Sequence, residues 1–136
     1  MDIRDAVEAD AERLADLSDA PTDVMRNLVH DRTVRVALAG DGDGDEIAGF
    51  VSFDAREGVV HITQLDGSPA ACERLLQEPI SFADRENMSV ELLVPDDETT
   101  VRSAAEDAGF KDVGTGPMFD GQPTTRYRLK PAERTT

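Results

Sequence analysis

Apolar residues recur with a helical period near the start of the chain and with a period of two in its middle. Over residues 7–18 the apolar positions are three or four residues apart, with charged residues between them, which predicts an amphipathic helix that ends before Pro21. A second short apolar stripe predicts another helix over residues 24–29. The segment 3–6 that precedes both helices is long enough only for an edge strand.

From Thr33 onward the apolar residues alternate with other residues, which is typical of strands. Three strands are expected, over residues 33–38, 47–53 and 59–65, with glycine-containing turns between them. Because the connections are short, consecutive strands should run antiparallel. The pattern therefore predicts a three-strand meander in the middle of the chain.

A long helix is expected directly after this meander. Ser68 is a favourable N-cap and Pro69 suits the first helical position, while Asn87 can take the left-handed conformation that ends a helix. Pro79 falls inside the helix, but the apolar stripe stays in phase across it, so we expect a kink rather than a break. The stripe consists of Cys72, Leu75, Leu76, Ile80 and Ala83.

The rest of the chain predicts a parallel crossover. Residues 88–94 form an apolar strand that follows a helix, so it should lie parallel to the strand that ends at Leu65. A last helix, capped by Asp96 or Asp97, should end at Gly109, and one or two strands should follow it. The order β-α-α-β-β-β-α-β-α-β-β indicates an α/β (α+β) fold: a mixed, mostly antiparallel sheet of six to seven strands with about four helices.

Length and composition limit the class of protein. A chain of 136 residues is expected to form one domain, here residues 1–130, followed by a flexible tail over residues 131–136. Its first residues are charged and contain no apolar signal segment, and the single cysteine, Cys72, fits a reducing compartment. No apolar run approaches the roughly 20 residues that a membrane span needs. We therefore expect a cytoplasmic protein without a membrane partner.

Acidic residues dominate the charge of the chain. There are 29 acidic and 14 basic residues, which gives a formal net charge of −15, and the acidic residues are spread over every segment. This charge should repel nucleic acid and anionic lipid. Acidic residues that are scattered rather than gathered in a tail favour adaptation to molar salt over recognition of a cationic partner. A halophilic protein is expected, with a fold that loosens at low ionic strength.

The stretch from Asp41 to Asp45 begins like a calcium-binding loop. The next position holds Glu46 where such a loop needs glycine, and Ser52 stands where the bidentate glutamate should be. A hairpin turn explains the stretch better, and no metal site is expected.

Three local strings, taken in their order along the chain, resemble those of a known superfamily. Residues 3–6 read Ile-Arg-Asp-Ala and are followed by Asp10 and a leucine-bearing helix. Residues 47–51 read Ile-Ala-Gly-Phe-Val, and residues 108–114 read Ala-Gly-Phe-Lys-Asp-Val-Gly. With the order of the elements, these strings resemble the GNAT acetyltransferase superfamily over about residues 2–129. The resemblance implies a GNAT-like domain.

The resemblance also implies a mechanism. In this family acetyl-CoA binds where the fourth and fifth strands part, with its pantetheine arm along the fourth strand. Its pyrophosphate lies at the start of the following helix, where open amides and the helix dipole favour an anion. An amine attacks the thioester while a base removes its proton, and a tyrosine on the last helix often protonates the thiolate. The acceptor would be a small-molecule or peptide amine.

The phosphate cradle departs from the family's pattern, which is Gln/Arg-x-x-Gly-x-Gly/Ala with a Leu-Leu pair three residues on. Aligning that pair with the leucine pair of the long helix puts Gly67, Ala70 and Cys72 at the three defining positions. An alternative register begins at Gln64 and keeps Gly67, but it puts Pro69 in the last place. The first register departs from the family's pattern at all three defining positions, and the second departs from it at the last. In addition, Pro69 removes one amide donor from the first turn of the helix, so the loop is degenerate in either register.

Small residues at the start of this helix still allow a close approach of the backbone. The expected cofactor-binding residues are therefore Leu65, Gly67, Ser68, Ala70, Ala71 and Cys72. Asp66 lies among them and adds negative charge near the phosphates, at a Coulomb cost of about 1–4 kcal/mol. Arg74 is the only cation in the first two turns of the helix.

Candidate acid–base residues are few. His61 lies on the fourth strand and could act as the base, since histidine titrates near neutral pH; a hydrogen-bonded structural histidine is the alternative. Glu91, on the next strand, is expected to be solvated and to point outward. Ala105 occupies the position of the family's tyrosine, and Tyr127 is the only tyrosine of the chain. Cys72 is expected to be a small core residue rather than a nucleophile.

Two functions of different classes follow from these observations. One is an acetyl-CoA-dependent N-acyltransferase with an altered phosphate loop. The other is a catalytically inactive GNAT-like module that senses a ligand or binds a protein. The two functions predict different results with acetyl-CoA: an acyltransferase should be stabilised by binding it, whereas a module that has lost the chemistry should not be. Pairing into a homodimer through sheet edges is a further option that the sequence leaves open.

Overall fold

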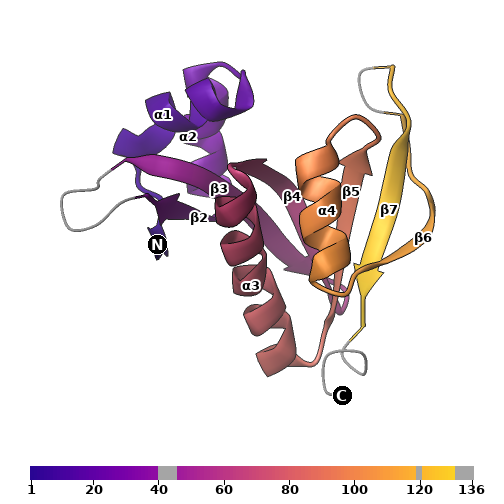
Figure 1. Ribbon diagram of the computed structural model, residues 1–136. Coiled ribbons are helices and arrows are strands. Elements are labelled where there is room, and N and C mark those ends of the chain that lie inside the picture. Colours follow the sequence, from indigo (N-terminus) through magenta and orange to yellow (C-terminus); the bar gives the residue numbers. More distant parts are fainter. Residues whose placement is uncertain (40–45, 119–120, 131–136) are drawn as a thin grey trace.

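The computed structural model describes residues 1–39, 46–118 and 121–130 and arranges them as one sheet flanked by helices (Figure 1). The strands are β1 (Asp2–Asp5), β2 (Thr33–Leu38), β3 (Ile47–Arg56), β4 (Val59–Gly67), β5 (Ser89–Pro95), β6 (Lys111–Thr115) and β7 (Thr124–Leu129). The helices are α1 (Ala11–Ser18), α2 (Thr22–Asp31), α3 (Pro69–Glu86) and α4 (Thr99–Asp107), and a 3₁₀ turn (Glu8–Asp10) precedes α1. The strands follow one another in the sheet as β1-β2-β3-β4-β5-β7-β6. The predicted α/β fold with a mixed, mostly antiparallel sheet is confirmed.

The direction of each strand follows from its connection. β2, β3 and β4 form the predicted antiparallel meander, and β1 pairs with its outer edge. Helix α3 carries the chain back along the sheet, so β5 runs parallel to β4, as predicted. β7 pairs antiparallel with β5 and separates it from β6. The one parallel pair, β4 and β5, therefore lies within an otherwise antiparallel sheet.

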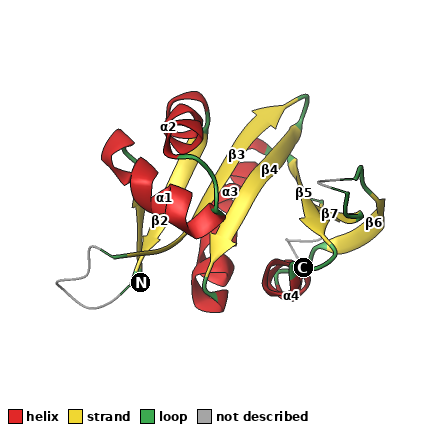
Figure 2. Ribbon diagram, turned by 90° about the horizontal axis from the view of Figure 1, so that it is seen from above, coloured by secondary structure: helices red, strands yellow, loops and turns green. Residues whose placement is uncertain are grey.

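Helices pack on both faces of the sheet (Figure 2). On one face, α3 and α4 bury a large apolar cluster that includes Leu65, Leu76 and Leu92. On the other face, α1 and α2 bury a second cluster around Leu14 and Phe50. Strands β2 and β3 contribute buried residues to both clusters, whereas the buried residues of β4 all belong to the cluster under α3 and α4. This packing against α3 and α4 fixes the position of the strand on which the candidate site is built.

Helix α3 begins and ends as its residues predict. Ser68 is the N-cap, and its Oγ accepts a hydrogen bond from the amide of Ala71 at 3.2 Å. Asn87 ends the helix in the left-handed conformation, with a φ of 56°. Pro79 does not divide the helix, which runs through it for 18 residues. The first turn of this long helix is therefore held firmly at the end of β4.

Helix α4 starts later than expected, because its N-cap is Glu98 rather than Asp96 or Asp97. The Asp96 carboxylate instead accepts hydrogen bonds from the hydroxyl of Thr125 on β7 at 3.1 Å and from Arg102 at 3.3 Å. Asp96 thus links the end of β5 to β7 and does not cap the helix.

Some expectations fall on residues outside the described ranges. They include the hairpin turn over residues 41–45 and the tail over residues 131–136. Among the helices of the described ranges, none is long and apolar enough to cross a membrane.

Candidate active site

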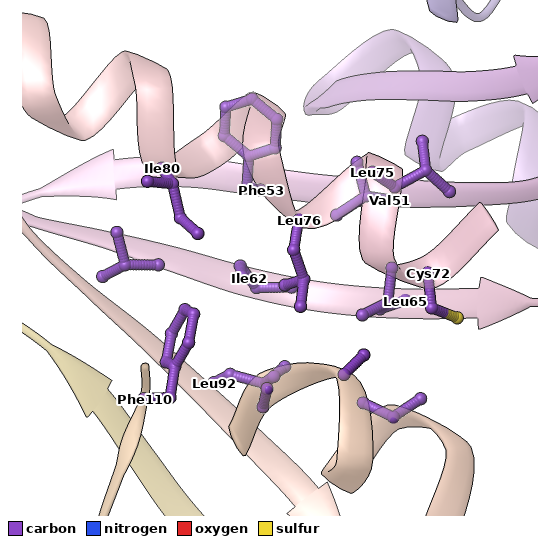
Figure 3. Packing of buried hydrophobic residues seen from close by; sticks show 14 of the residues in the cluster. Val51, Phe53, Ile62, Leu65, Cys72, Leu75, Leu76, Ile80, Leu92 and Phe110 are labelled. Carbon is purple, nitrogen blue, oxygen red and sulfur yellow. The ribbon is translucent and has the colours of Figure 1, made fainter. Parts of the chain in front are cut away.

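The parallel strands β4 and β5 part in the middle of the sheet. Their paired residues run from Val59 and Ser89 to Ile62 and Leu92, and the pairing ends there. β4 nevertheless continues beside β3 as far as Gly67, and β5 continues beside β7. Figure 3 shows the two strands diverging on the side where α3 begins. The split that the family resemblance implies is therefore present in this chain.

A β-bulge in β4 accounts for the split. Ser52 of β3 pairs with Gln64, and the next residue, Phe53, pairs with Ile62, so Thr63 has no residue opposite it. An extra residue of this kind bends a strand and increases its local twist. Because the bulge comes directly after the last residue that pairs with β5, it turns β4 away from β5 at that point. Nothing in the residue types around Thr63 indicates this bulge beforehand.

Beyond the bulge, one edge of β4 is open. Among the described residues, those from Gln64 to Gly67 pair only with β3, and the segment 63–67 extends over about 17 Å. An extended ligand can hydrogen-bond to such an edge as an added strand would. Leu65 is buried on the α3 face of this edge beside Cys72, in the apolar cluster to which Leu92 also belongs (Figure 3). The open edge thus combines main-chain donors and acceptors with an apolar floor.

The start of α3 offers fewer amides than a phosphate cradle needs. The first four N–H groups of a helix have no partner within the helix. Here the amide of Ser68 donates to the carbonyl oxygen of Ala48 at 3.1 Å, and that of Ala71 donates to the Ser68 side chain. Pro69 has no N–H. Within the described part of the chain, the amide of Ala70 is therefore the one open donor of this turn.

Two glycines set the distance between β3 and the start of α3. Gly67 has a φ of 138°, which favours glycine, and a Cβ at this position would lie 2.5 Å from the Cα of Gly49. A Cβ on Gly49 would in turn lie 2.9 Å from the Cβ of Ala71. Gly67 was expected at the site, whereas Gly49 was expected only as part of a strand. The contact between the two glycines lets the first turn of α3 pack directly on β3.

Acidic side chains gather near the start of α3. A pocket of about 260 Å³ lies between α3 and α4, and Glu73 and Asp107 both line it. Glu98 adds a further carboxylate as the N-cap of α4. Arg74, the expected cation, lies 3.9 Å from the carboxylate of Glu78, one turn further along α3. A diphosphate at this helix start would meet negative charge that dissolved salt has to screen.

Cys72 is buried beneath the start of α3 and is a packing residue, as predicted. Its thiol has no exposed surface, and Sγ lies 3.7 Å from the carbonyl oxygen of Gly67. Burial, together with the negative charges of Asp66 and Glu98, raises the pKa of the Cys72 thiol to about 11. The thiolate is the reactive form of cysteine, so this thiol is a poor nucleophile at neutral pH.

His61 lies one residue before the end of the β4–β5 pairing, and therefore at the closed end of the split. It pairs with Asp54 of β3 and with Glu91 of β5. Residues opposite one another in a sheet share a face, so the three side chains lie on the same face, away from α3 and α4. The role of His61 as a base stays a prediction.

Glu91 is not a solvated residue, and the expectation that it would be is wrong. It is only 7% exposed, and its carboxylate pairs with both Arg126 and Arg128 of β7, with Arg126 at 2.6 Å. Burial alone would raise the pKa of Glu91, but the hydrogen bonds from Arg128 and Arg126 outweigh it and lower the pKa. A carboxylate that is held ionised in this way is a weak base. Its role is to fasten β7 to β5.

The last helix has no acid at the position of the family's tyrosine, because Ala105 stands there and is fully buried. Tyr127 lies on β7, and its hydroxyl donates to the carboxylate of Glu106 on α4 at 3.1 Å. Burial, and after it the hydrogen bond to Glu106, raise the pKa of Tyr127. Its proton is therefore held more tightly than that of an ordinary tyrosine.

Several solved structures with this arrangement are named as acetyltransferases. Arabidopsis thaliana NAA60 in complex with acetyl-CoA matches with a TM-score of 0.75 at 16% identity, over 95% of this chain and 97% of that chain. A ribosomal-protein-alanine N-acetyltransferase from Brucella melitensis matches with a TM-score of 0.75 at 16% identity, over 96% of this chain and 99% of that chain. A variant of the spermidine N-acetyltransferase SpeG from Vibrio cholerae matches with a TM-score of 0.74 at 14% identity, over 98% of this chain and 95% of that chain. No protein-family model matches the sequence, and no curated protein does.

These likenesses establish the architecture of the chain. A protein from Desulfovibrio desulfuricans that is assigned to the GNAT family shares it as well, with a TM-score of 0.72 at 19% identity, over 95% of this chain and 98% of that chain. The chain therefore has the GNAT fold over nearly its whole length, as the sequence resemblance implied.

Proposed function

We propose that this chain is an N-acyltransferase that takes its acyl group from acetyl-CoA and transfers it to an amine. The observation that carries the proposal is the split between β4 and β5, which begins at the bulge on Thr63 and ends at the first turn of α3. The neighbours in structure support it, since one of them contains acetyl-CoA and two are named as N-acetyltransferases.

The split fits the two ends of acetyl-CoA unequally. The open edge over residues 63–67 suits an extended pantetheine arm, because it offers main-chain hydrogen bonds above an apolar floor. The start of α3 suits the diphosphate less well, with the open amide of Ala70 and with Glu73 and Glu98 nearby. We therefore expect a ligand that is held mainly along β4 and that binds best when salt screens the carboxylates.

Each predicted cofactor residue has a distinct part in this proposal. When bound, acetyl-CoA supplies a thioester whose carbonyl carbon is the electrophile. Leu65 excludes water from beneath the open edge, and Gly67 brings the chain into the helix without a side chain in the way. Ser68 holds the first turn of α3 in shape, and the amide of Ala70 is available to a phosphate. The small side chains of Ala71 and Cys72 are buried and keep the turn close to β3.

The acceptor is proposed to be a small-molecule or peptide amine. Spermidine and a ribosomal protein are named as acceptors for two of the neighbours in structure. His61 lies on the face of the sheet opposite to α3, where an amine could approach the end of the split. The variant His61→Gln, described below, tests whether His61 takes part in the proton transfer.

The acidic composition is proposed to be an adaptation to salt. The net charge of −15 is carried by residues in every segment, and it disfavours nucleic acid as a partner. In a cytoplasm with molar salt, the screening length falls to about 3 Å, so that such a surface no longer repels itself. The same screening would let an anionic cofactor approach the acidic end of the split.

Acetyl-CoA at millimolar concentration is expected to raise the melting temperature by several degrees in about 1 M KCl, because a ligand of the native state stabilises it. The variant Ala70→Trp should abolish this gain, since the exposed Ala70 lies at the start of α3 and a bulky ring there blocks the cradle. Ser81→Trp, a similar change at an exposed position later in the same helix, should keep the gain.

Differential scanning fluorimetry of the three proteins, with acetyl-CoA and with free CoA, measures these shifts. A wild-type protein whose melting neither ligand changes in high salt contradicts the enzyme proposal. That result would leave the non-catalytic module as the function of the chain.

A further inference from the structure

Asp66 is the one ionisable side chain on the open edge of β4. It pairs with Phe50 of β3, and Phe50 belongs to the apolar cluster beneath α1 and α2. Residues opposite one another share a face of the sheet, so the Asp66 side chain leaves the sheet on the face opposite to α3. The sequence suggested that this carboxylate lies near the phosphates. In the structure its side chain instead leaves the sheet on the face opposite to α3, away from the phosphate cradle.

The surroundings of Asp66 hold its carboxylate in place. Gln64, two residues earlier on the same strand, donates a hydrogen bond from Nε2 to Oδ2 of Asp66 at 3.0 Å. Asp66 is half-buried. Its position is thus fixed beside the open edge, by a neighbour that belongs to the same edge.

The charge environment makes this carboxylate a better proton acceptor than an ordinary aspartate. Burial raises the pKa of Asp66 by more than the hydrogen bond from Gln64 lowers it, and the carboxylate of Glu98 adds to the rise. The titratable groups that interact with Asp66 from the packed helices are Glu98 at the start of α4 and the thiol of Cys72 in α3. A general base works best when its pKa approaches the working pH.

We propose that Asp66 is the general base of the acyl transfer and that Gln64 positions it, an inference that rests on the proposed function. The amine nitrogen forms a bond to the thioester carbonyl carbon, and the carbon–sulfur bond breaks, with its electron pair leaving on sulfur. The proton lost by the nitrogen passes to an Asp66 oxygen and from there to the sulfur. The products are an amide and a free thiol, and Asp66 is ionised again.

The other candidates are less well placed for this step. His61 belongs to the part of β4 that is still paired with β5. Glu91 is held ionised by two arginines, and the Tyr127 hydroxyl donates to Glu106. His61 and Glu91 share the face of Asp66, but among these residues Asp66 alone lies on the open edge of β4, where an amine can reach a bound thioester.

Replacement of Asp66 by asparagine keeps the shape of the side chain but removes the proton acceptor. With a wild-type protein that acetylates an amine, we expect kcat to fall about 100-fold or more in Asp66→Asn, the usual contribution of a general base. The KM for acetyl-CoA should not rise, since a negative charge has been removed. Glu57→Gln, the same change of charge in an exposed turn, should leave kcat unaltered, while Asp66→Glu should recover part of the rate.

The dependence of kcat/KM on pH separates a base from a merely structural residue. Activity should rise with pH through the pKa of Asp66, because the base must be ionised, and this rising limb should be absent in Asp66→Asn. Carboxyl-carbon NMR of the unliganded protein, which needs no activity, should give Asp66 a midpoint above that of an ordinary aspartate. Gln64→Ala should lower kcat and leave the rising limb in place.

The outcomes distinguish this inference from the proposed function. An active wild type with an Asp66→Asn variant within threefold of its kcat overturns the inference and leaves the function standing. The inference is equally overturned if His61→Gln, and not Asp66→Asn, removes the rising limb. A wild type that neither binds acetyl-CoA nor acetylates any amine fails the proposed function, and the inference fails with it.

Discussion

Replacing Gly49 by alanine is expected to lower the free energy of unfolding by about 1–3 kcal/mol, the usual cost of overpacking a well-packed interior. A Cβ at this position would lie 2.6 Å from the carbonyl oxygen of Asp66 and 2.9 Å from the Cβ of Ala71. The first atom is backbone of β4, and the second belongs to the first turn of α3, so neither can move alone. Urea denaturation of the variant measures the loss.

The same substitution should also weaken the binding of acetyl-CoA, because it pushes the start of α3 away from the open edge of β4. Gly58→Asn is the matched control. A Cβ at Gly58 would meet nothing within 4 Å, and asparagine tolerates its positive φ. This control should be nearly as stable as the wild type and should bind acetyl-CoA equally well. If Gly49→Ala proved as stable as the control, the close packing of β3 on α3 would not be a requirement of the fold.

Raising KCl from about 0.1 M to about 1 M is expected to tighten acetyl-CoA binding about tenfold, since the screening length falls from about 10 Å to about 3 Å. Salt ordinarily weakens the binding of phosphates to cationic sites. Here we expect the opposite dependence on salt, because Glu73 and Asp107 line the pocket beside the cradle and Glu98 occupies the N-cap position of the neighbouring helix. The same salt should raise the melting temperature of the free protein, whose net charge is −15.

Titration calorimetry at several salt concentrations tests this reversal. The double variant Glu73→Gln, Glu98→Gln should bind acetyl-CoA more tightly than the wild type at low salt, and its affinity should change less with salt. Glu86→Gln, an exposed carboxylate at the far end of α3, should behave like the wild type. An affinity that falls as KCl rises would show that cations, and not carboxylates, govern the cradle.

The order of the elements could be predicted from the sequence because local chemistry determines it. The alternation after Thr33, the N-cap at Ser68 and the left-handed Asn87 each depend on residues close by, and all three were found as predicted. The parallel pairing of β4 and β5 followed from the helix between them. Such features need no knowledge of what packs against them.

The features that define the candidate site depend on the partner strands and were not predictable. The bulge at Thr63 exists only in the register between β3 and β4, and no residue type marks it. The face on which Asp66 emerges follows from that same register. Glu91 reads as an outward-facing strand residue, yet two arginines from β7 enclose it, and the position of β7 beside β5 was not evident from the sequence.

The phosphate cradle lies between these two cases. Its loss of one amide at Pro69 could be predicted, because proline lacks the donor. The hydrogen bond from the Ser68 amide to the carbonyl oxygen of Ala48 could not be predicted, since it depends on the position of β3 beside the start of α3. The sequence therefore indicated a damaged cradle but did not show that Ala70 is its open donor.

The central claim is that the open edge of β4 receives the pantetheine arm of acetyl-CoA. Backbone amide NMR of the ¹⁵N-labelled protein in about 1 M KCl, titrated with acetyl-CoA, tests it most directly. We expect the largest shifts at residues 63–67, at Ala70 and at the end of β5. Binding that shifts only residues away from the split, for example those of β1 and β2, would contradict the claim.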